Sequence, residues 1–235
     1  AGSTLNLKGI KDNGFRTYIA ISGEIDLEPY LGSKSTFTFG GFGGLNGKAL
    51  KAGDQLEITG GKNRLVNLRG RKKLPDKYRP MYTKKWEIEV LAGPHEAPDY
   101  FTYEDVEMFY STTWKVNHNS NRLGYRLEGP EFSFARESGE EGGEHPSNIL
   151  DYAYAIGTIN ISGNTPVILT ADGPSLGGFV SIATIPSFEL WKIGQVQPNA
   201  EINFNKISIR DAEIKRSKFK RRLNIIKDLI KYKRN

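Results

Sequence analysis

Three irregular segments of the chain are dense in uncharged side chains that donate and accept hydrogen bonds. They are Asn117–Arg122, the pair Ser147–Asn148 with nearby Asp151, and the loop Asp172–Gly178. Amide and hydroxyl groups suit a planar, neutral ligand that offers several donors and acceptors. The same residue types also close turns. The residues alone therefore support a small-ligand site and a set of turns about equally.

Several other site chemistries are disfavoured by the residues. The chain has no cysteine, and its three histidines do not stand at zinc-ligand spacing, so we expect no metal site. Ser175 lies outside any Gly-x-Ser-x-Gly elbow and has no evident base. The run Gly40–Gly44 lacks the Gly-Lys-Ser/Thr ending of a phosphate loop, which predicts a structural turn.

The charge of the chain is concentrated at its C-terminal end. The whole sequence carries +6, whereas Arg210–Asn235 holds 11 Lys or Arg and 3 Asp or Glu, a net of +8, so the remainder is slightly acidic. Nucleic-acid binding is not expected, because no aromatic residues are interleaved with the basic ones in a stacking pattern. We also expect no membrane span and no secretion signal, which makes a cytoplasmic location the default.

The elements that must position the polar segments are mostly strands. Alternating or short apolar runs separated by glycine-marked turns indicate β-structure through much of the chain. The strands expected are Phe15–Ser22, Phe37–Phe39, Gln55–Ile58, Trp86–Leu91, Trp114–Val116, Tyr154–Ile161, Pro166–Thr170 and Gly178–Ile185. The basic stretch Lys62–Tyr82 is expected to be an exposed excursion between strands.

Two helices are expected. Thr102 and Asp105 form a capping-box pattern, which predicts a short helix over Asp99–Ser111. In the tail, the stripe Ile214, Phe219, Leu223, Ile226 and Ile230 predicts an amphipathic helix of three or four turns. This helix could pack on its own domain, dock on a partner or membrane surface, or begin an interdomain linker.

Five longer motifs resemble the carboxyltransferase region of urea carboxylases more than that of the related 5-oxoprolinases. They occur in family order over about residues 15 to 205. The motifs are Gly93–Thr102, Asn119–Pro130, His145–Ile149, Asp172–Val180 and Glu189–Gln195.

The resemblance implies a mainly β fold, a cyclophilin-like β-barrel with short helices, followed here by the C-terminal amphipathic helix. It divides the chain into a partial carboxyltransferase domain, residues 1–206, and a basic helix or linker, residues 207–235. It also implies transfer of a carboxyl group from carboxybiotin to urea, which gives allophanate. The partners implied are urea or a similar small amide, a biotin carboxylase, a biotin carrier and the remaining carboxyltransferase regions.

The resemblance also suggests roles for the polar segments, which we state as hypotheses. Asp151 and Asn148 would hydrogen-bond the urea NH2 groups, and Tyr152 or Tyr154 would meet its carbonyl. The biotin ureido group or the transferring carboxylate would be bound by Asn121, Arg122 and Arg126. Further binding residues would come from the neighbouring loops, partly through backbone N–H groups: Ser147, Asp172, Ser175, Gly177 and Gly178.

The chain departs from the family pattern at three positions. Glu24 replaces a glycine, Leu150 stands where the family has a histidine before Asp151, and Ser181 replaces a cysteine. A Met-Lys-Met biotinylation motif is also absent from the sequence. Two functions stay open: a piece of a working carboxylase that depends on its partners, or a non-catalytic ligand-binding or regulatory derivative. Guanidine is an alternative substrate, because an acidic residue such as Asp151 could favour a cation.

Overall fold

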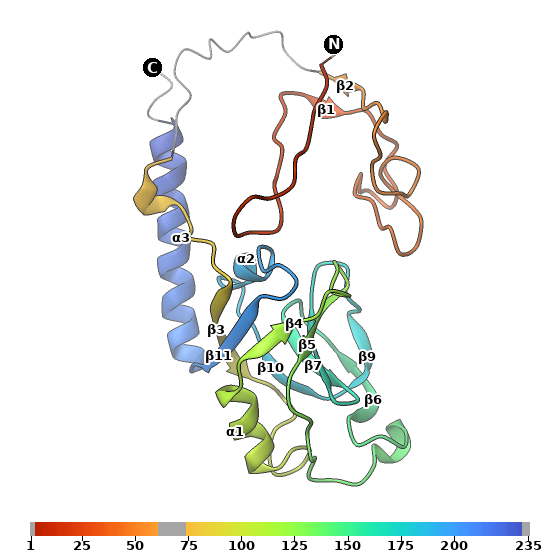
Figure 1. Cartoon of the computed structure of the whole chain (residues 1–235), viewed down its shortest axis with the longest axis vertical. Helices are drawn as coiled ribbons and strands as arrows, with labels where there is room; N and C mark the ends of the chain where they lie inside the picture. Colours follow the sequence, from red (N-terminus) through yellow and green to blue (C-terminus); the bar gives the residue numbers. More distant parts are fainter. Residues whose placement is uncertain (1–2, 61–73, 232–235) are drawn as a thin grey trace. The chain divides into compact units, whose positions relative to one another are not determined.

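A computed structural model describes residues 3–60 and 74–231 of the chain (Figure 1). The chain divides into two compact units, one formed by Thr17–Lys77 and the other by Ala1–Arg16 with Tyr78–Asn235. The motifs of the sequence analysis that carry candidate site residues all fall in the second unit.

The second unit is built around a closed barrel of seven strands (Figure 1). The barrel order is β10-β3-β11-β4-β5-β8-β7, and every neighbouring pair is antiparallel except β11 with β3. The strands are β3 (Lys85–Ala92), β4 (Trp114–Val116), β5 (Gly124–Glu128), β7 (Thr158–Ser162), β8 (Thr165–Leu169), β10 (Ser181–Thr184) and β11 (Glu201–Lys206). The prediction of a mainly β, barrel-forming fold is confirmed.

Strand β3 shows why the apolar alternation forms a barrel wall. Trp86, Ile88 and Val90 are buried, whereas Lys85 before them and Glu87 between the first two are exposed. A period of two places every second side chain on the inner face of a strand. The predictions for Trp86–Leu91 and Trp114–Val116 are therefore confirmed, with boundaries moved by one residue at each end of the first.

Aromatic rings fill the core between the barrel and the following helix. Phe109 stacks on Phe204 with ring centroids 5.0 Å apart, and Phe101 stacks on Phe134 at 5.5 Å. The indole N–H of Trp114 donates to the Phe109 carbonyl at 3.0 Å, so this buried donor is satisfied. Helix α1 (Tyr103–Ser111) is thereby fixed against β4 and β11.

The predicted capping box is present in α1 (Tyr103–Ser111). The Asp105 N–H donates to the Thr102 hydroxyl, and the Thr102 N–H donates to the Asp105 carboxylate. The two shorter helical segments in this unit near the barrel are α2 (Leu190–Ile193) and η2 (Glu140–Gly142). The helix expected over Asp99–Ser111 is confirmed as an element, but it begins at Tyr103, directly after the Thr102 cap, and not at Asp99.

Strands β6 (Asn148–Ala153) and β9 (Leu176–Phe179) form a separate two-stranded sheet. The expected strand Tyr154–Ile161 begins only at Thr158, because Gly157 takes a φ of 94° and turns the chain there. The expected strand Gly178–Ile185 is split at Val180, whose N–H donates to Ser147 while its carbonyl accepts from Ile161. The chain thus passes from β9 into the barrel through one residue.

Gly177 of β9 is required by packing against Tyr154. A Cβ on Gly177 would lie 2.9 Å from Cε2 of that ring. We expect Gly177→Ala to lower the free energy of unfolding by about 1–2 kcal/mol, as overpacking of a fixed ring does. Thermal unfolding measures the change, with Gly9→Ala as the control because a Cβ on Gly9 meets nothing within 4 Å. Equal melting temperatures for both variants would contradict the packing role.

In the unit Thr17–Lys77, the described residues contain little regular structure. Strand β1 (Glu24–Ile25) pairs with β2 (Ile58–Thr59), and an isolated bridge joins Phe37 to Phe42. The expected strands Phe15–Ser22 and Phe37–Phe39 are wrong, and of Gln55–Ile58 only the last residue is in a strand. Their apolar side chains find no sheet to cover, as the 83% exposure of Tyr18 shows. Periodicity indicates a strand only where a neighbour can pair with it.

The glycine run in the same unit forms the expected turn. Gly41, Gly43 and Gly44 have φ values of 71°, 72° and 54°, which favour glycine. Part of the expected excursion Lys62–Tyr82 lies outside the described residues; within its described part, η1 spans Asp76–Tyr78.

Helix α3 (Ile209–Lys231) is longer than the three or four turns expected, at 23 residues. Ala212 is its buried residue near the start, and Lys215 pairs with Glu89 of β3. Ile214 and Ile230 lie on opposite sides of the helix, because a helix turns by about 100° per residue and the two are 16 positions apart in the chain. Ile214 is 46% exposed. None of the helices in the described part of the chain is long and apolar enough to cross a membrane.

Candidate functional site

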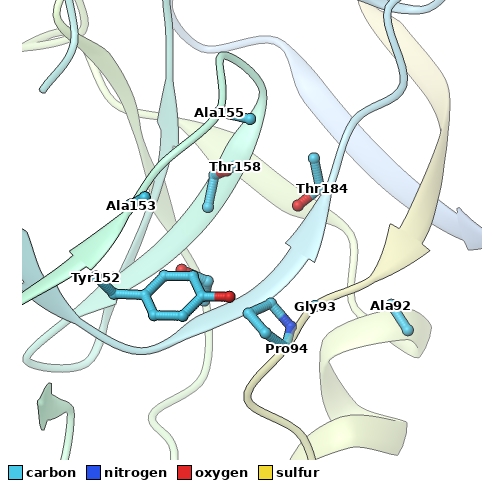
Figure 2. A pocket seen from close by; sticks show the side chains of 9 residues that line it. Ala92, Gly93, Pro94, Tyr152, Ala153, Ala155, Thr158 and Thr184 are labelled. Atoms are coloured by element: carbon cyan, nitrogen blue, oxygen red, sulfur yellow. The ribbon is translucent and has the colours of Figure 1, made fainter. Parts of the chain in front are cut away.

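A pocket of about 390 Å³ opens where the ends of β3, β6, β7 and β10 meet (Figure 2). Figure 2 shows the Tyr152 ring reaching across towards Pro94, with Thr158 and Thr184 on the other side of the opening. The lining residues are small or bear hydroxyl groups: Ala92, Gly93, Pro94, Tyr152, Ala153, Ala155, Thr158, Ser181 and Thr184.

The lining offers hydrogen bonds without charge. Tyr152, Thr158, Ser181 and Thr184 each contribute a hydroxyl that can donate and accept, and none of the nine lining residues is ionised at neutral pH. Alanine methyl groups supply the apolar part of the wall. Such a surface suits a small neutral ligand with several donors and acceptors, because a charged ligand would lose hydration without gaining a counter-charge from the lining.

His95 lies directly behind two of the lining residues. Its Nδ1 accepts a hydrogen bond from the Ser181 N–H at 3.0 Å, and its ring meets the Tyr152 ring edge to face with centroids 4.9 Å apart. The imidazole also meets the Tyr100 ring edge to face with centroids 4.7 Å apart, and the Arg136 guanidinium lies over the Tyr100 ring at 4.7 Å. Burial lowers the pKa of His95, and the positive charge of Arg136 acts in the same direction.

A second network begins at Ser181. The Ser181 hydroxyl donates to Oδ1 of Asn160 at 2.9 Å, and the Asn160 side chain lies close enough to act on the pKa of the Tyr154 hydroxyl. That hydroxyl donates to the Phe179 carbonyl and accepts from the Phe179 N–H. Burial raises the pKa of Tyr154, so its hydroxyl stays protonated. Tyr154 thus joins β9 to the end of β6 and to the barrel.

The predicted site residues on β6 and β9 come together beside the pocket. Tyr152 lines it directly, and Gly177 is its partner across the β6–β9 ladder. Asp151 is exposed next to Tyr152 and is close enough to Tyr154 to raise the pKa of that phenol. Neither Asp151 nor Tyr154 is a lining residue.

The neighbouring predicted residues support the sheet around Tyr152. Asn148 pairs with Phe179 at the start of β6, and its carbonyl accepts from Arg136. The fully buried Ser147 hydroxyl accepts from the Gly163 N–H. A Cβ on Gly178 would approach the Ile149 carbonyl at 2.9 Å, and the Ser175 carbonyl accepts from the Tyr154 N–H. Each of these contacts gives the predicted residue a role in holding the β6–β9 sheet in place.

The remaining predicted residues form a different group at the start of β5. Arg122 makes an ion pair with Asp172 at 2.9 Å, and the Asn121 side chain accepts from the Leu123 N–H. The Arg126 N–H donates to the Ser120 hydroxyl, while its side chain is exposed on β5. None of these four residues lines the pocket. In the described ranges 3–60 and 74–231 there is also no cluster of metal-ligating side chains.

Sequence reasoning missed Thr158, Thr184, Asn160 and the place of His95. In sequence, the two threonines look like ordinary strand residues. They face each other because β7 and β10 pair in the barrel, with Thr184 opposite Thr158 and Ser181 opposite Asn160. His95 was visible only as part of a family-like motif, and Ser181 only as a departure from the family's cysteine. The pairing that makes them neighbours spans 86 positions of the chain.

The chain matches one protein family and several known proteins. A family described as "Carboxyltransferase domain, subdomain A and B" matches residues 1–206. The chain is 50% identical over 210 residues to "Urea amidolyase" of Saccharomyces cerevisiae. The aligned region covers 88% of this chain and 11% of that protein. It is 37% identical to "Putative urea carboxylase" of Emericella nidulans over 222 residues, covering 94% of this chain and 18% of that protein.

The fold is also similar to that of a solved urea carboxylase structure. The urea carboxylase of Kluyveromyces lactis superposes with a TM-score of 0.76 at 42% identity, covering 88% of this chain and 19% of that one. The chain therefore spans a small part of the length of its urea amidolyase and urea carboxylase relatives.

Proposed function

Since the chain belongs to the carboxyltransferase domain family, subdomains A and B, we propose that it contributes the acceptor site of a urea carboxylase. In this proposal the carboxyl group of carboxybiotin passes to urea and gives allophanate. The observation that carries the proposal is the uncharged, hydroxyl-lined pocket beside Tyr152, in a chain 50% identical to a urea amidolyase. Biotin carboxylase, carrier and further carboxyltransferase regions would be its partners, in the same protein or in others.

Urea fits the chemistry of the pocket. It is planar, neutral and rich in donors and acceptors, and the four lining hydroxyls can meet both kinds of group. The volume of about 390 Å³ lies in the usual range for small-ligand sites, roughly 300–1,000 Å³. It exceeds what urea alone needs, and the alanine methyls with the hydroxyls also suit the neutral ureido ring of biotin. Carboxybiotin, when bound, would supply the activated carboxyl group.

The work of the chain in this reaction is orientation. Urea is a weak nucleophile, so a productive geometry contributes more than a strong base. We propose that the Tyr152 hydroxyl donates to the urea carbonyl while the Thr158 and Thr184 hydroxyls accept from its NH2 groups. Asp151, with Asn148, is a further candidate acceptor at the edge of the site. Tyr154 is assigned a supporting role, because its hydroxyl already donates to the Phe179 carbonyl and accepts from the Phe179 N–H.

Calorimetric titration of the chain with urea, guanidinium chloride and biotin tests this assignment. We expect urea to bind and Tyr152→Phe to weaken the affinity about fivefold, the equivalent of one neutral hydrogen bond. Tyr103→Phe is the matched control, because Tyr103 is exposed on α1 away from the pocket lining. Failure of a folded sample to bind any of the three ligands would contradict the acceptor site.

The same titration with Asp151→Ala separates the two candidate substrates. A guanidinium ion would need the carboxylate, since the pocket lining carries no charge. If Asp151→Ala still binds urea more tightly than guanidinium, Asp151 is not part of the site. Loss of urea binding would retain it as an acceptor, and selective loss of guanidinium binding would identify the cation as the substrate.

A further inference from the structure

The pocket wall is held from behind by a row of packed side chains. Arg136 lies over Tyr100, Tyr100 meets His95, and His95 meets Tyr152. Each step is a contact with ring centroids or the guanidinium carbon less than 5 Å from the next ring. The Tyr152 ring, although 41% exposed, is therefore supported on its inner side by a side chain that is only 5% exposed.

His95 contacts two lining residues of the pocket, and these belong to two different strands. Its ring meets the Tyr152 ring from β6, and its Nδ1 accepts the Ser181 N–H from β10. The backbone repeats the second link, because the His95 N–H donates to the Ser181 carbonyl at 3.3 Å. Ser181 in turn orients Asn160 through its hydroxyl. One imidazole thus sets the distance between the β6 wall and the β10 wall.

We infer that His95 is a positioning residue for the acceptor pocket, holding Tyr152 and Ser181 in place only while its imidazole is neutral. The inference rests on the proposed function in so far as the pocket binds urea. Nδ1 can accept from the Ser181 N–H only when it carries no proton, which places the proton of neutral His95 on Nε2. Protonation would set two N–H donors against each other at 3.0 Å.

The surroundings of His95 oppose its protonation. The charged group that faces it is Arg136, and the titratable side chains packed against its ring are Tyr100 and Tyr152. Burial, and after it the positive charge of Arg136, lower the pKa of His95 from its ordinary value of 6.5. The support is complete above pH 6.5 and is lost as the pH falls through the lower value in the folded chain.

Nuclear magnetic resonance of the isotope-labelled chain tests the link without any ligand. Between about pH 8 and pH 5 we expect the Tyr152 ring signals and the Ser181 amide signal to shift with the same midpoint as the His95 imidazole. In His95→Phe the Tyr152 signals should be constant over this range. Tyr152 and Ser181 signals that ignore the protonation of His95 would overturn the inference.

Urea is the probe for the consequence at the pocket. We expect the wild-type affinity for urea to fall about tenfold below the His95 midpoint. His95→Phe, which keeps the ring but loses the acceptor, should bind about tenfold more weakly at neutral pH with no further fall in acid. His95→Asn, whose side-chain oxygen can accept the Ser181 N–H, should recover part of the affinity and be independent of pH.

A control separates positioning from general destabilisation. Asp105→Asn weakens a buried cap that contacts α1, Ser133 and Phe134 but no pocket residue, so it should keep both the wild-type affinity and its pH dependence. A urea affinity that does not change with pH, or wild-type affinity in His95→Phe, would overturn the positioning role. Coupled His95 and Tyr152 signals without urea binding would instead reject the proposed function and leave the positioning role standing.

Discussion

Asp105→Ala is expected to lower the free energy of unfolding by about 4 kcal/mol. The Asp105 carboxylate is 3% exposed and accepts three backbone N–H groups, from Thr102, Ser133 and Phe134, at 3.1, 2.8 and 2.9 Å. Each buried donor left without a partner costs about 1–3 kcal/mol. The loss also removes the capping box and a negative charge from the first turn of α1.

Unfolding in guanidinium chloride, followed by tryptophan fluorescence, measures this change in the barrel unit. All three tryptophans, Trp86, Trp114 and Trp191, belong to that unit. Asp105→Asn keeps one acceptor oxygen and should lose about half as much stability. Glu107→Ala, on the exposed side of α1, should change it by less than about 0.5 kcal/mol. A similar loss in Glu107→Ala would show that helix propensity, not the buried carboxylate, dominates.

The contacts of Asp105 show which hydrogen bonds a local sequence pattern can predict and which it cannot. Thr102 and Asp105 predict the cap because the capping box joins residues only three positions apart. The bonds from Ser133 and Phe134 cross 28 and 29 positions and have no signature in sequence. The same carboxylate therefore has one predictable contact and two that arise from packing.

The same distinction explains the site. Alternation predicted the barrel strand around Trp86–Leu91, and the family resemblance suggested Tyr152 as a site residue, which the structure places in the pocket lining. Thr158 and Thr184 became pocket residues only through the pairing of β7 with β10. Near the N-terminus, by contrast, apolar runs such as Phe15–Ser22 predicted strands that do not form. Periodicity reports which side chains could share a face, whereas closure of a sheet decides which faces meet.

Filling the pocket is expected to have the largest effect on activity. Ala155 lines the pocket yet is exposed, and its carbonyl, which accepts the Thr158 N–H, is unaffected by a change of side chain. Ala155→Trp should place an indole in the space proposed for urea. We expect carboxylation of urea to fall about a hundredfold or more, since displacement of a reactant by even an ångström or so costs on this order. Incorporation of labelled bicarbonate, assayed with the biotin carboxylase and carrier regions present, measures the rate.

Ile156→Trp is the matched control for this variant. Ile156 is the next residue in the chain, is 56% exposed, and is not a lining residue, so the same indole there should leave the rate unchanged. Because both positions are exposed, each variant should keep its stability to within about 0.5 kcal/mol. A wild-type rate in folded Ala155→Trp would mean that urea is carboxylated elsewhere. Since Arg122 and Asp172 form the other group of predicted residues, the surface at the start of β5 would then become the next place to look.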